Sequence, residues 1–249
     1  MTPQKPYADA GRGYRMRCAP KGGEHRFQVV VEETDLFVVA ARDLRGEVAD
    51  LVHTLRASLK GYITLHPEFL TSLAPVPVPP NGPEIVRAMA DAGRVCNVGP
   101  MASVAGAIAQ RVADGLRPAS PDILVENGGD VFLHSTRERL VGLLPFPEGD
   151  ILLGLRLPPS DFPCALCSSS ATIGHSLSFG HGDLVVVKAG DGALADAAAT
   201  ALANRIRSSR DINPVLKEAK KFAGHGVKGV FAQIGDDVGV WGEMELVEI

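Results

Sequence analysis

Two predicted β-hairpins constrain the fold more than any other sequence feature. They lie near the two ends of the part of the chain in which helices and strands are predicted. Residues 27–31 and 36–41 are β-rich runs separated by a short polar turn. Residues 229–234 and 239–247 flank a second turn, at Gly235-Asp236-Asp237. Consecutive strands joined by short turns pair in the antiparallel sense. A regularly alternating parallel sheet is therefore not expected.

Helical and extended segments fill the interval between the hairpins. The predicted helices are 44–59, 83–92, 101–114, 193–208 and 214–222, and the predicted strands are 95–98, 123–126, 131–133, 151–157 and 184–188. This mixture favours an α+β fold, with mixed or antiparallel sheets and packed helices. We expect a polar N-terminal segment at residues 1–24 and a single domain at 25–249. A segment with five prolines in nine residues, 75–83, is predicted to be a surface loop of that domain, with an interdomain linker as the alternative.

Composition excludes several classes of protein. The formal charge of −4 and the aromatic content of 5% do not suit a surface that binds phosphate backbones or stacks on bases, so no nucleic-acid partner is expected. No apolar run reaches the roughly 18–20 residues that a membrane span requires. Residues 1–23 are polar and basic and lack the apolar region of a secretory signal. We therefore expect a cytoplasmic protein with no membrane association.

A small-residue helix around Asp196 carries the most informative pattern. Asp196 and Thr200 are four residues apart among alanines, so they share one helix face. A carboxylate and a hydroxyl are hard oxygen ligands, suited to Mg²⁺ or Ca²⁺. The structural alternative is that Asp196 supports the first turn of its own helix while Thr200 bonds to the carbonyl four residues earlier. The pattern alone leaves both interpretations open.

The turn Asn127-Gly128-Gly129-Asp130 is a second candidate site. It follows a predicted helix, 101–114, that is rich in glycine and alanine. Glycines let backbone N–H groups approach a phosphate or a flavin edge closely. The structural alternative is a tight turn between two strands, with both glycines at positive φ.

The segment around Asp196 resembles the signature of the ApbE-like superfamily, the FAD:protein FMN transferases. A strand, here Asp183-Leu184-Val185-Val186-Val187, precedes a helix start of the type Ala-Asp-Ala-x-Ala-Thr-Ala. Family members also carry an Asn-Gly-Gly-Asp-like turn after a central strand. In that family the Asp and the Thr of the helix bind Mg²⁺, which holds the pyrophosphate of FAD. The resemblance thus implies Asp196 and Thr200 as metal ligands, and FAD or FMN with Mg²⁺ as cofactors.

Two family elements are altered in this chain. Where transferases have a Gly-x-x-Lys-Gly stretch, residues 99–106 contain no lysine; Gly99 and Ala102 are the expected cofactor contacts there. In place of a His-x-x-Asp-Pro-x-Thr-Gly-like element, residues 172–180 keep His175 but lose the Asp-Pro. Thr172 begins this hydroxyl-rich stretch and is another expected cofactor contact. The chain thus resembles a branch apart from the standard transferases.

The resemblance implies a reaction in which FMN moves from FAD to a threonine of an acceptor protein. A flavin nucleotide and an acceptor protein are then the expected partners. Asp196 and Thr200 would hold the metal, His175 or Asp130 would handle the proton, and Asn127, Gly128 and Gly129 would contact the cofactor. A non-catalytic binding module of the same fold remains the alternative, because of the altered elements.

A third hypothesis belongs to another class of protein. Cys164 and Cys167 form a Cys-x-x-Cys pair, a spacing that suits a redox dithiol or half of a zinc site. With Cys18 and Cys96 they make up the four cysteines of the chain, which are expected to be reduced thiols. Structural thiols, sulfur or redox transfer by Cys164 and Cys167, and metal binding all stay open from the spacing alone.

Overall fold

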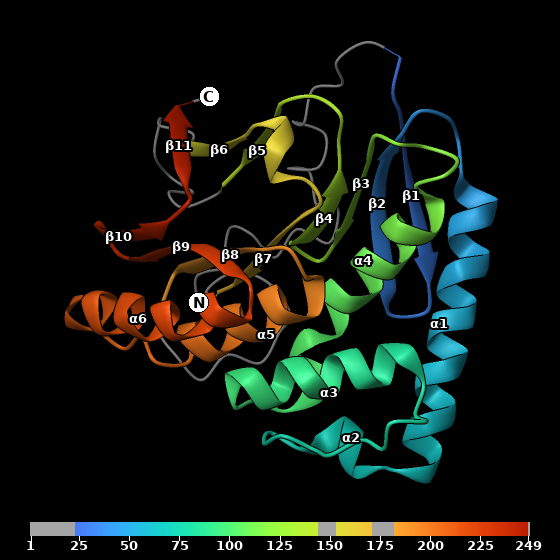
Figure 1. The fold of residues 1–249 in the computed structure, drawn as a ribbon, viewed down its shortest axis with the longest axis horizontal. Helices are drawn as coiled ribbons and strands as arrows, with labels where there is room; N and C mark the ends of the chain where they lie inside the picture. Colours follow the sequence, from blue (N-terminus) through green and yellow to red (C-terminus); the bar gives the residue numbers. More distant parts are fainter. Residues whose placement is uncertain (1–22, 144–152, 171–181, 249) are drawn as a thin grey trace, which may run out of the picture.

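An antiparallel sheet runs through the protein and organises the rest of it (Figure 1). The computed structural model describes residues 23–143, 153–170 and 182–248 of the chain. Within these residues the main sheet has eight strands, in the order β1-β2-β3-β4-β7-β8-β9-β10. They are β1 (His25–Val31), β2 (Thr34–Ala40), β3 (Ile123–Asn127), β4 (Asp130–His134), β7 (Cys164–Ser169), β8 (Leu184–Ala189), β9 (Val227–Ile234) and β10 (Asp237–Gly242). Every neighbouring pair is antiparallel.

Helices cover one face of this sheet and a second, smaller sheet covers part of the other. The helices are α1 (Arg45–Leu65), α2 (Glu68–Thr71), α3 (Glu84–Cys96), α4 (Val104–Leu116), α5 (Gly192–Ala203) and α6 (Ile212–Ala219). The 3₁₀ turns are η2 (Pro100–Ser103), η3 (Pro159–Asp161), η4 (Ser209–Asp211) and η5 (Lys220–His225). The small sheet consists of β11 (Glu245–Glu248), β6 (Leu153–Leu157) and β5 (Arg139–Gly142), in that order.

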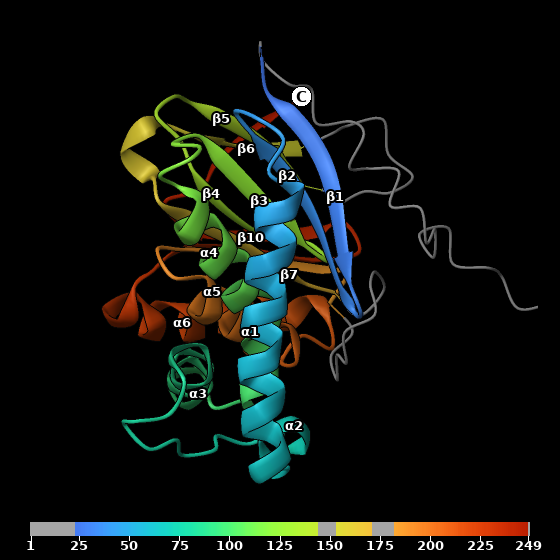
Figure 2. The same cartoon turned by 90° about the vertical axis from the view of Figure 1, so that its right-hand side faces the viewer.

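The two faces of the main sheet belong to two separate hydrophobic cores. Successive residues of a strand point to opposite faces, so Val185 and Val187 join the core beneath the helices, whereas Leu184 and Val186 join the core beneath the small sheet. Figure 2 shows the sheet from its β1 side, with α1 along it and α2 and α3 below. This arrangement confirms the predicted α+β class.

Helix α5 lies at the centre of the helical layer. It packs against β7, β8, α3 and α4, and all of its residues except Thr200 are buried. A helix surrounded on nearly every side needs small side chains to bring its neighbours close, which accounts for its run of alanines. The small residues noted in the sequence thus serve close packing.

Several sequence predictions were wrong in detail. Residues 95–98 do not form a strand: α3 continues to Cys96 and ends at Asn97, whose φ is 56°. The helix predicted to reach residue 208 ends at Ala203. The last predicted strand is divided, because β10 ends at Gly242 and β11 joins the small sheet. Strands β5 and β7 were not predicted. The proline-rich segment forms neither helix nor strand, and its Val76 and Val78 pack on the helical core.

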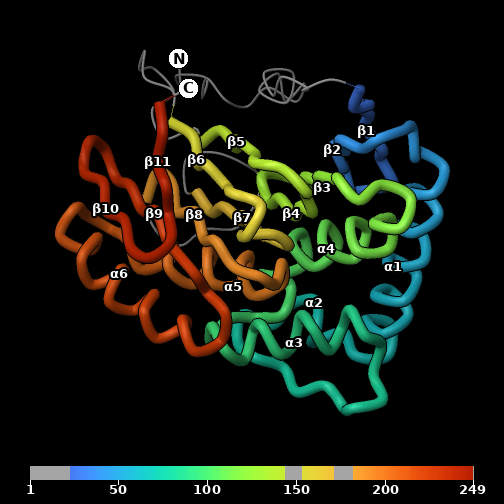
Figure 3. The backbone as a smooth tube through the Cα atoms, turned by 45° about the horizontal axis from the view of Figure 1, so that its top comes forward, coloured from blue at the N-terminus to red at the C-terminus, as the bar shows by residue number. Residues whose placement is uncertain are grey.

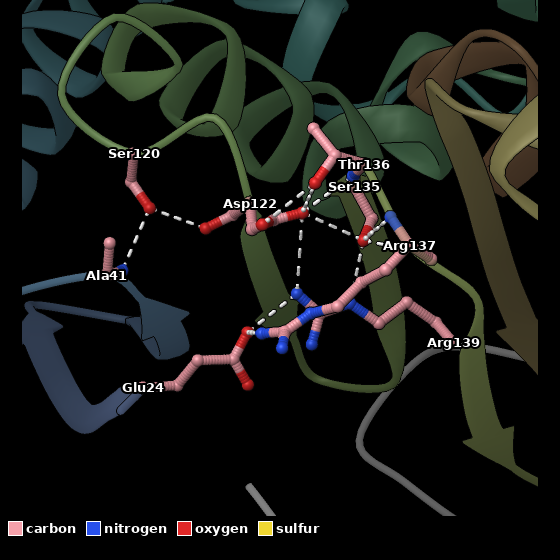
Figure 4. Close-up of polar contacts among 8 residues, drawn as sticks. All are labelled: Glu24, Ala41, Ser120, Asp122, Ser135, Thr136, Arg137 and Arg139. Carbon is pink, nitrogen blue, oxygen red and sulfur yellow. Dashed lines mark hydrogen bonds and ion pairs between the residues drawn. The ribbon is translucent and has the colours of Figure 1, made fainter. Parts of the chain in front are cut away.

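A polar cluster joins the start of β1 to the connection between β4 and β5 (Figure 4). Arg137 and Arg139 both donate to the carboxylate of Glu24, each over 2.6 Å. Burial raises the pKa of Glu24, but the hydrogen bonds and charges of the two arginines outweigh it and lower that pKa below its usual value. Asp122 accepts from Ser135 and from the backbone and hydroxyl of Thr136. These bonds hold together two segments that are far apart in the sequence: Glu24 lies before β1, whereas Arg137 and Arg139 follow β4.

Among the described residues, no helix is both long enough and apolar enough to cross a bilayer.

Candidate functional site

The fold brings two predicted site residues together in the protein interior. Asp196 lies in the second turn of α5, and Asp130 is the first residue of β4. Both side chains are buried, and the charge of Asp196 acts on Asp130. The site therefore forms where the start of β4 meets α5, with the start of α4 and the end of β7 as its other walls.

Asp196 binds the N-terminus of a neighbouring helix. Its Oδ2 accepts a hydrogen bond from the backbone N–H of Gly106 over 2.9 Å, and the backbone of Ala105 also contributes. Gly106 lies in the first turn of α4, where N–H groups have no partner within the helix. The first turn of α5 is capped instead by Asp191, which accepts from Leu194 N. The alternative in which Asp196 supports its own helix is therefore wrong.

Asp130 is held from the opposite side of the site. Its Oδ1 accepts from the backbone N–H of Ser168 over 3.0 Å, and it lies beside Cys167, whose thiol donates to the Gly192 carbonyl over 3.6 Å. The Ser168 hydroxyl donates to the Gly129 carbonyl, and Gly129 N donates to Oε1 of Glu126. These bonds fix the carboxylate of Asp130 against β7.

The two carboxylates make the site strongly electronegative. Burial raises the pKa of Asp196 to about 7, although the backbone of Gly106 and Ala105 acts in the opposite direction. Burial and the charge of Asp196 raise the pKa of Asp130 well above its usual value. Within the described part of the chain, no Lys or Arg forms an ion pair with either group. Two buried carboxylates without a basic partner suit a cation.

The donor set fits a hard divalent cation that takes only part of its ligands from the protein. No group of three or more His, Cys, Asp or Glu side chains in the described ranges could hold a metal ion. Asp196 and Thr200 would supply one carboxylate and one hydroxyl, which leaves coordination positions for water or phosphate oxygens. Mg²⁺ binds in this way, with one or two carboxylates, water and substrate phosphate.

Thr200 is the second predicted metal ligand on α5. It is the one residue of α5 that is not buried, and it lies one turn after Asp196 on the same face. The hydroxyls of Thr54 and Thr64 donate to the carbonyl four residues earlier. No such bond is formed by Thr200 in the part of the chain described, so its hydroxyl is available.

A backbone contact between two helices shapes the same region. Gly106 of α4 and Gly192 of α5 face each other, and a Cβ added to Gly106 would lie 2.2 Å from the Gly192 carbonyl oxygen. Gln110 Oε1 accepts from Gly192 N over 2.7 Å. Only glycine allows this approach, and the approach places Asp196 within reach of the N-terminus of α4.

The Asn127-Gly128-Gly129-Asp130 segment is the tight turn between β3 and β4. Asn127 pairs with Asp130, and Gly128 and Gly129 have φ values of 69° and 107°. These values are those of a type I′ hairpin turn, which requires positive φ at both central residues. The Asn127 amide donates to the Ala105 carbonyl over 3.2 Å, so the turn also touches the start of α4. A cofactor contact by this turn stays a prediction.

Gly99 and Ala102 lie just before α4, around η2. A Cβ on Gly99 would meet the Ser72 carbonyl oxygen at 1.9 Å, so close packing explains this glycine. Ala102 is partly buried, and its N–H donates to the Gly99 carbonyl. Their predicted contacts with a cofactor are not tested by this geometry. Thr172 and His175 lie outside the described residues.

The Cys-x-x-Cys hypothesis is contradicted by the structure. Cys164 and Cys167 are both on β7, and residues three apart on a strand point to opposite faces. Cys164 belongs to the core beneath the small sheet and Cys167 to the core beneath the helices. Burial raises the pKa of Cys164 to about 12, and burial and the charges of Asp130 and Asp196 raise that of Cys167. The two thiols can neither form a dithiol pair nor chelate one metal.

Alkylation of the native protein is expected to spare both thiols of β7. At pH 8, iodoacetamide should modify Cys164 and Cys167 more than about a hundredfold more slowly than in the urea-unfolded chain, because a buried neutral thiol is a poor nucleophile. Mass spectrometry of peptides after timed quenching measures this. Rapid native labelling of both residues, or a disulfide between them under mild oxidation, would contradict the assignment to opposite faces.

Sequence reasoning missed three parts of the site. Cys167 and Ser168 were considered apart from Asp130, because β7 was not predicted. Gly106 belongs to the predicted helix 101–114, but its contact with Asp196 was not predicted. The sequence did contain a signal for the contact of Gly106. Two segments rich in small residues, each containing a glycine, favour close packing of the helices that they form.

Comparisons with known proteins agree with this fold. The family described as "AbpE bacteria" matches residues 16–239. A UPF0280 protein of Methanocaldococcus jannaschii is 38% identical over 229 residues, which covers 89% of this chain and 92% of that protein. The flavinyl transferase ApbE of Pseudomonas stutzeri matches in structure with a TM-score of 0.55 at 12% identity, over 88% of this chain and 94% of that one. The flavin transferase ApbE of Vibrio cholerae gives 0.53 at 13% identity, over 88% and 97%. At such identities these structural matches establish the fold.

Proposed function

The chain belongs to the family described as "AbpE bacteria", an ApbE-like family, and we propose that it binds a flavin nucleotide through a divalent cation at Asp196 and Thr200, beside Asp130. One observation carries the proposal: two buried carboxylates meet in the described structure without a basic partner. A cation offsets their charge, and a nucleotide pyrophosphate then completes the coordination of that cation.

We assign Mg²⁺ to Asp196 and Thr200, with the pyrophosphate of FAD as a further ligand of the metal. Asp196 carries the charge, and Thr200 supplies the available hydroxyl one turn later. The start of α4 adds the favourable field of a helix N-terminus for an anion. The φ-positive turn at Gly128 has open space around it, so its backbone can approach a ligand closely.

The reaction we propose is transfer of FMN from FAD to a hydroxyl of an acceptor protein. The hydroxyl oxygen attacks the phosphorus of the FMN half, the bond from that phosphorus to the AMP phosphate oxygen breaks, and AMP leaves. Bound Mg²⁺ would neutralise charge on the pyrophosphate. Asp130 accepts the proton of the hydroxyl, because a carboxylate with a raised pKa is a stronger base than an ordinary one. His175 is the other residue we propose for this proton.

Titration of FAD into the purified protein, with and without Mg²⁺, tests the proposed site. We expect Mg²⁺ to tighten FAD binding at least about tenfold, and Asp196→Asn to remove that gain. Asparagine keeps an acceptor for Gly106 N–H, so the variant should retain the fold. Asp236→Asn, an exposed acid at the tip of the β9–β10 hairpin, is the matched control and should bind like the wild type.

Product analysis separates binding from catalysis. Release of AMP, with FMN attached to an acceptor protein or set free by water, identifies an enzyme. Mg²⁺-dependent binding without AMP release identifies a non-catalytic flavin-binding protein with the same site. No FAD binding at high micromolar concentration, or equal binding by the wild type and Asp196→Asn, would contradict the proposal.

A further inference from the structure

The last strand of the main sheet has an open edge. In the described part of the chain, β10 pairs only with β9, and it lies at the opposite end of the sheet from β1 (Figure 3). Such an edge presents unpaired N–H and C=O groups that can pair with another strand. Proteins usually protect these edges with lysine, proline or a covering segment.

The hairpin geometry determines which backbone groups of β10 point outward. Ile234 pairs with Asp237 across a two-residue turn, so these two residues form a hydrogen-bonded pair. Because such pairs alternate along an antiparallel ladder, Gly239 also bonds to β9. The N–H and C=O groups of Val238 and Val240 therefore point away from the sheet.

The side chains on this edge are apolar and exposed. Val238 and Val240 keep 41% and 39% of their surface exposed. They lie on the face opposite α6, because a Cβ on Gly239 would meet Ile212 and Leu216 of that helix. Residues 238–242 contain neither a charged residue nor a proline, whereas the edge strand β1 carries His25 and Arg26. The one charged residue of β10, Asp237, lies at its first position beside the hairpin turn, so the rest of the strand carries nothing that opposes pairing.

The strand is complementary to a second copy of itself. When two copies of β10 pair antiparallel about a two-fold axis through Gly239, Val238 of each chain lies opposite Val240 of the other. These are the residues whose backbone groups point outward, so each such pair can form hydrogen bonds. The valine side chains of both chains then lie on one face and cover each other. A two-fold contact requires this self-complementarity, since the same patch serves both subunits.

We propose that the protein forms a homodimer in which β10 pairs antiparallel with β10 of a second copy about an axis through Gly239. The two main sheets then continue into each other. This interface is separate from the Asp130 and Asp196 site and does not depend on the proposed function.

Sedimentation velocity of the full chain tests this directly. At tens of micromolar, the wild type is expected at twice the chain mass of 26.2 kDa. Val240→Lys should sediment as a monomer, because it places an ammonium group in the valine contact. Val30→Lys is the matched control: it changes a valine that is 60% exposed on the other edge strand, and the dimer should persist. A monomeric wild type, or a dimeric Val240→Lys protein, would overturn the proposal.

Disulfide trapping tests the register and remains informative if Val240→Lys fails to fold. In a Cys18→Ser background, the double variant Val238→Cys, Val240→Cys should form a covalent dimer under mild oxidation, since each new cysteine faces its counterpart in the partner. The single variant Val240→Cys should give little covalent dimer, because it faces Val238. Equal crosslinking of the single and double variants, or none in either, would reject the register.

Discussion

Gly106→Ala is expected to destabilise the protein by about 3 kcal/mol, against the ordinary effect of alanine in a helix. Alanine in place of a helical glycine usually stabilises by roughly 0.5–1 kcal/mol. Here the added methyl group would lie 2.2 Å from the Gly192 carbonyl oxygen and 2.9 Å from the Asp196 Cβ. Both neighbours are fixed within a packed helix, so α4 and α5 must move apart. Urea unfolding followed by circular dichroism measures the change.

Gly61→Ala provides the matched control. Gly61 lies within α1, and a Cβ added there would have no atom within 4 Å. The same substitution should therefore stabilise the protein by roughly 0.5–1 kcal/mol. If Gly106→Ala is as stable as the wild type, or if both variants change in the same direction, the close contact between α4 and α5 is not as described.

Without metal, the wild type is expected to lose stability as pH rises. Asp196→Asn is expected to lose much less. The carboxyl group of Asp196 has a pKa of 3.8 in an ordinary environment, and burial raises it to about 7 in the folded protein. The folded state thus holds this proton more tightly than the unfolded chain does. The resulting stability is fully present below pH 3.8 and is lost as pH rises through about 7.

The size of the effect follows from the shift. Each unit of pKa difference corresponds to about 1.4 kcal/mol, so a few kcal/mol are expected to disappear between pH 4 and 8. Asparagine carries no charge and also relieves Asp130, whose pKa is raised by burial and by Asp196. In EDTA at pH 8, Asp196→Asn should therefore be more stable than the wild type.

Urea unfolding of the two proteins at pH 5 and pH 8 gives this comparison. Titrating groups remote from the site, such as Glu24, contribute equally in both proteins and cancel in the difference, which therefore reports Asp196 together with its effect on Asp130. Addition of Mg²⁺ at pH 8 should stabilise the wild type and leave the variant unchanged. If the free energy of unfolding changes equally with pH in the two proteins, the description of Asp196 as a buried carboxylate without a basic partner is wrong.

The sequence by itself determined the class of fold and the two ends of the main sheet. Both hairpins were predictable because short polar turns and β-rich runs are local signals. The helix around Asp196 and Thr200 and the turn at Gly128-Gly129 were also readable from short segments, since spacing along one helix face and φ-positive glycines depend on nearby residues alone.

The contacts between those segments were decided only by the tertiary structure. Strand β7 is composed largely of Cys, Ala and Ser, so only its place between β4 and β8 identifies it as a strand. Its pairing separates Cys164 from Cys167 and brings Cys167 beside Asp130. Likewise, Gly106 and Asp196 are 90 residues apart, and their hydrogen bond exists because α4 and α5 cross at two glycines. Local sequence specifies each element, whereas contacts between distant elements determine the burial and the charge of the site.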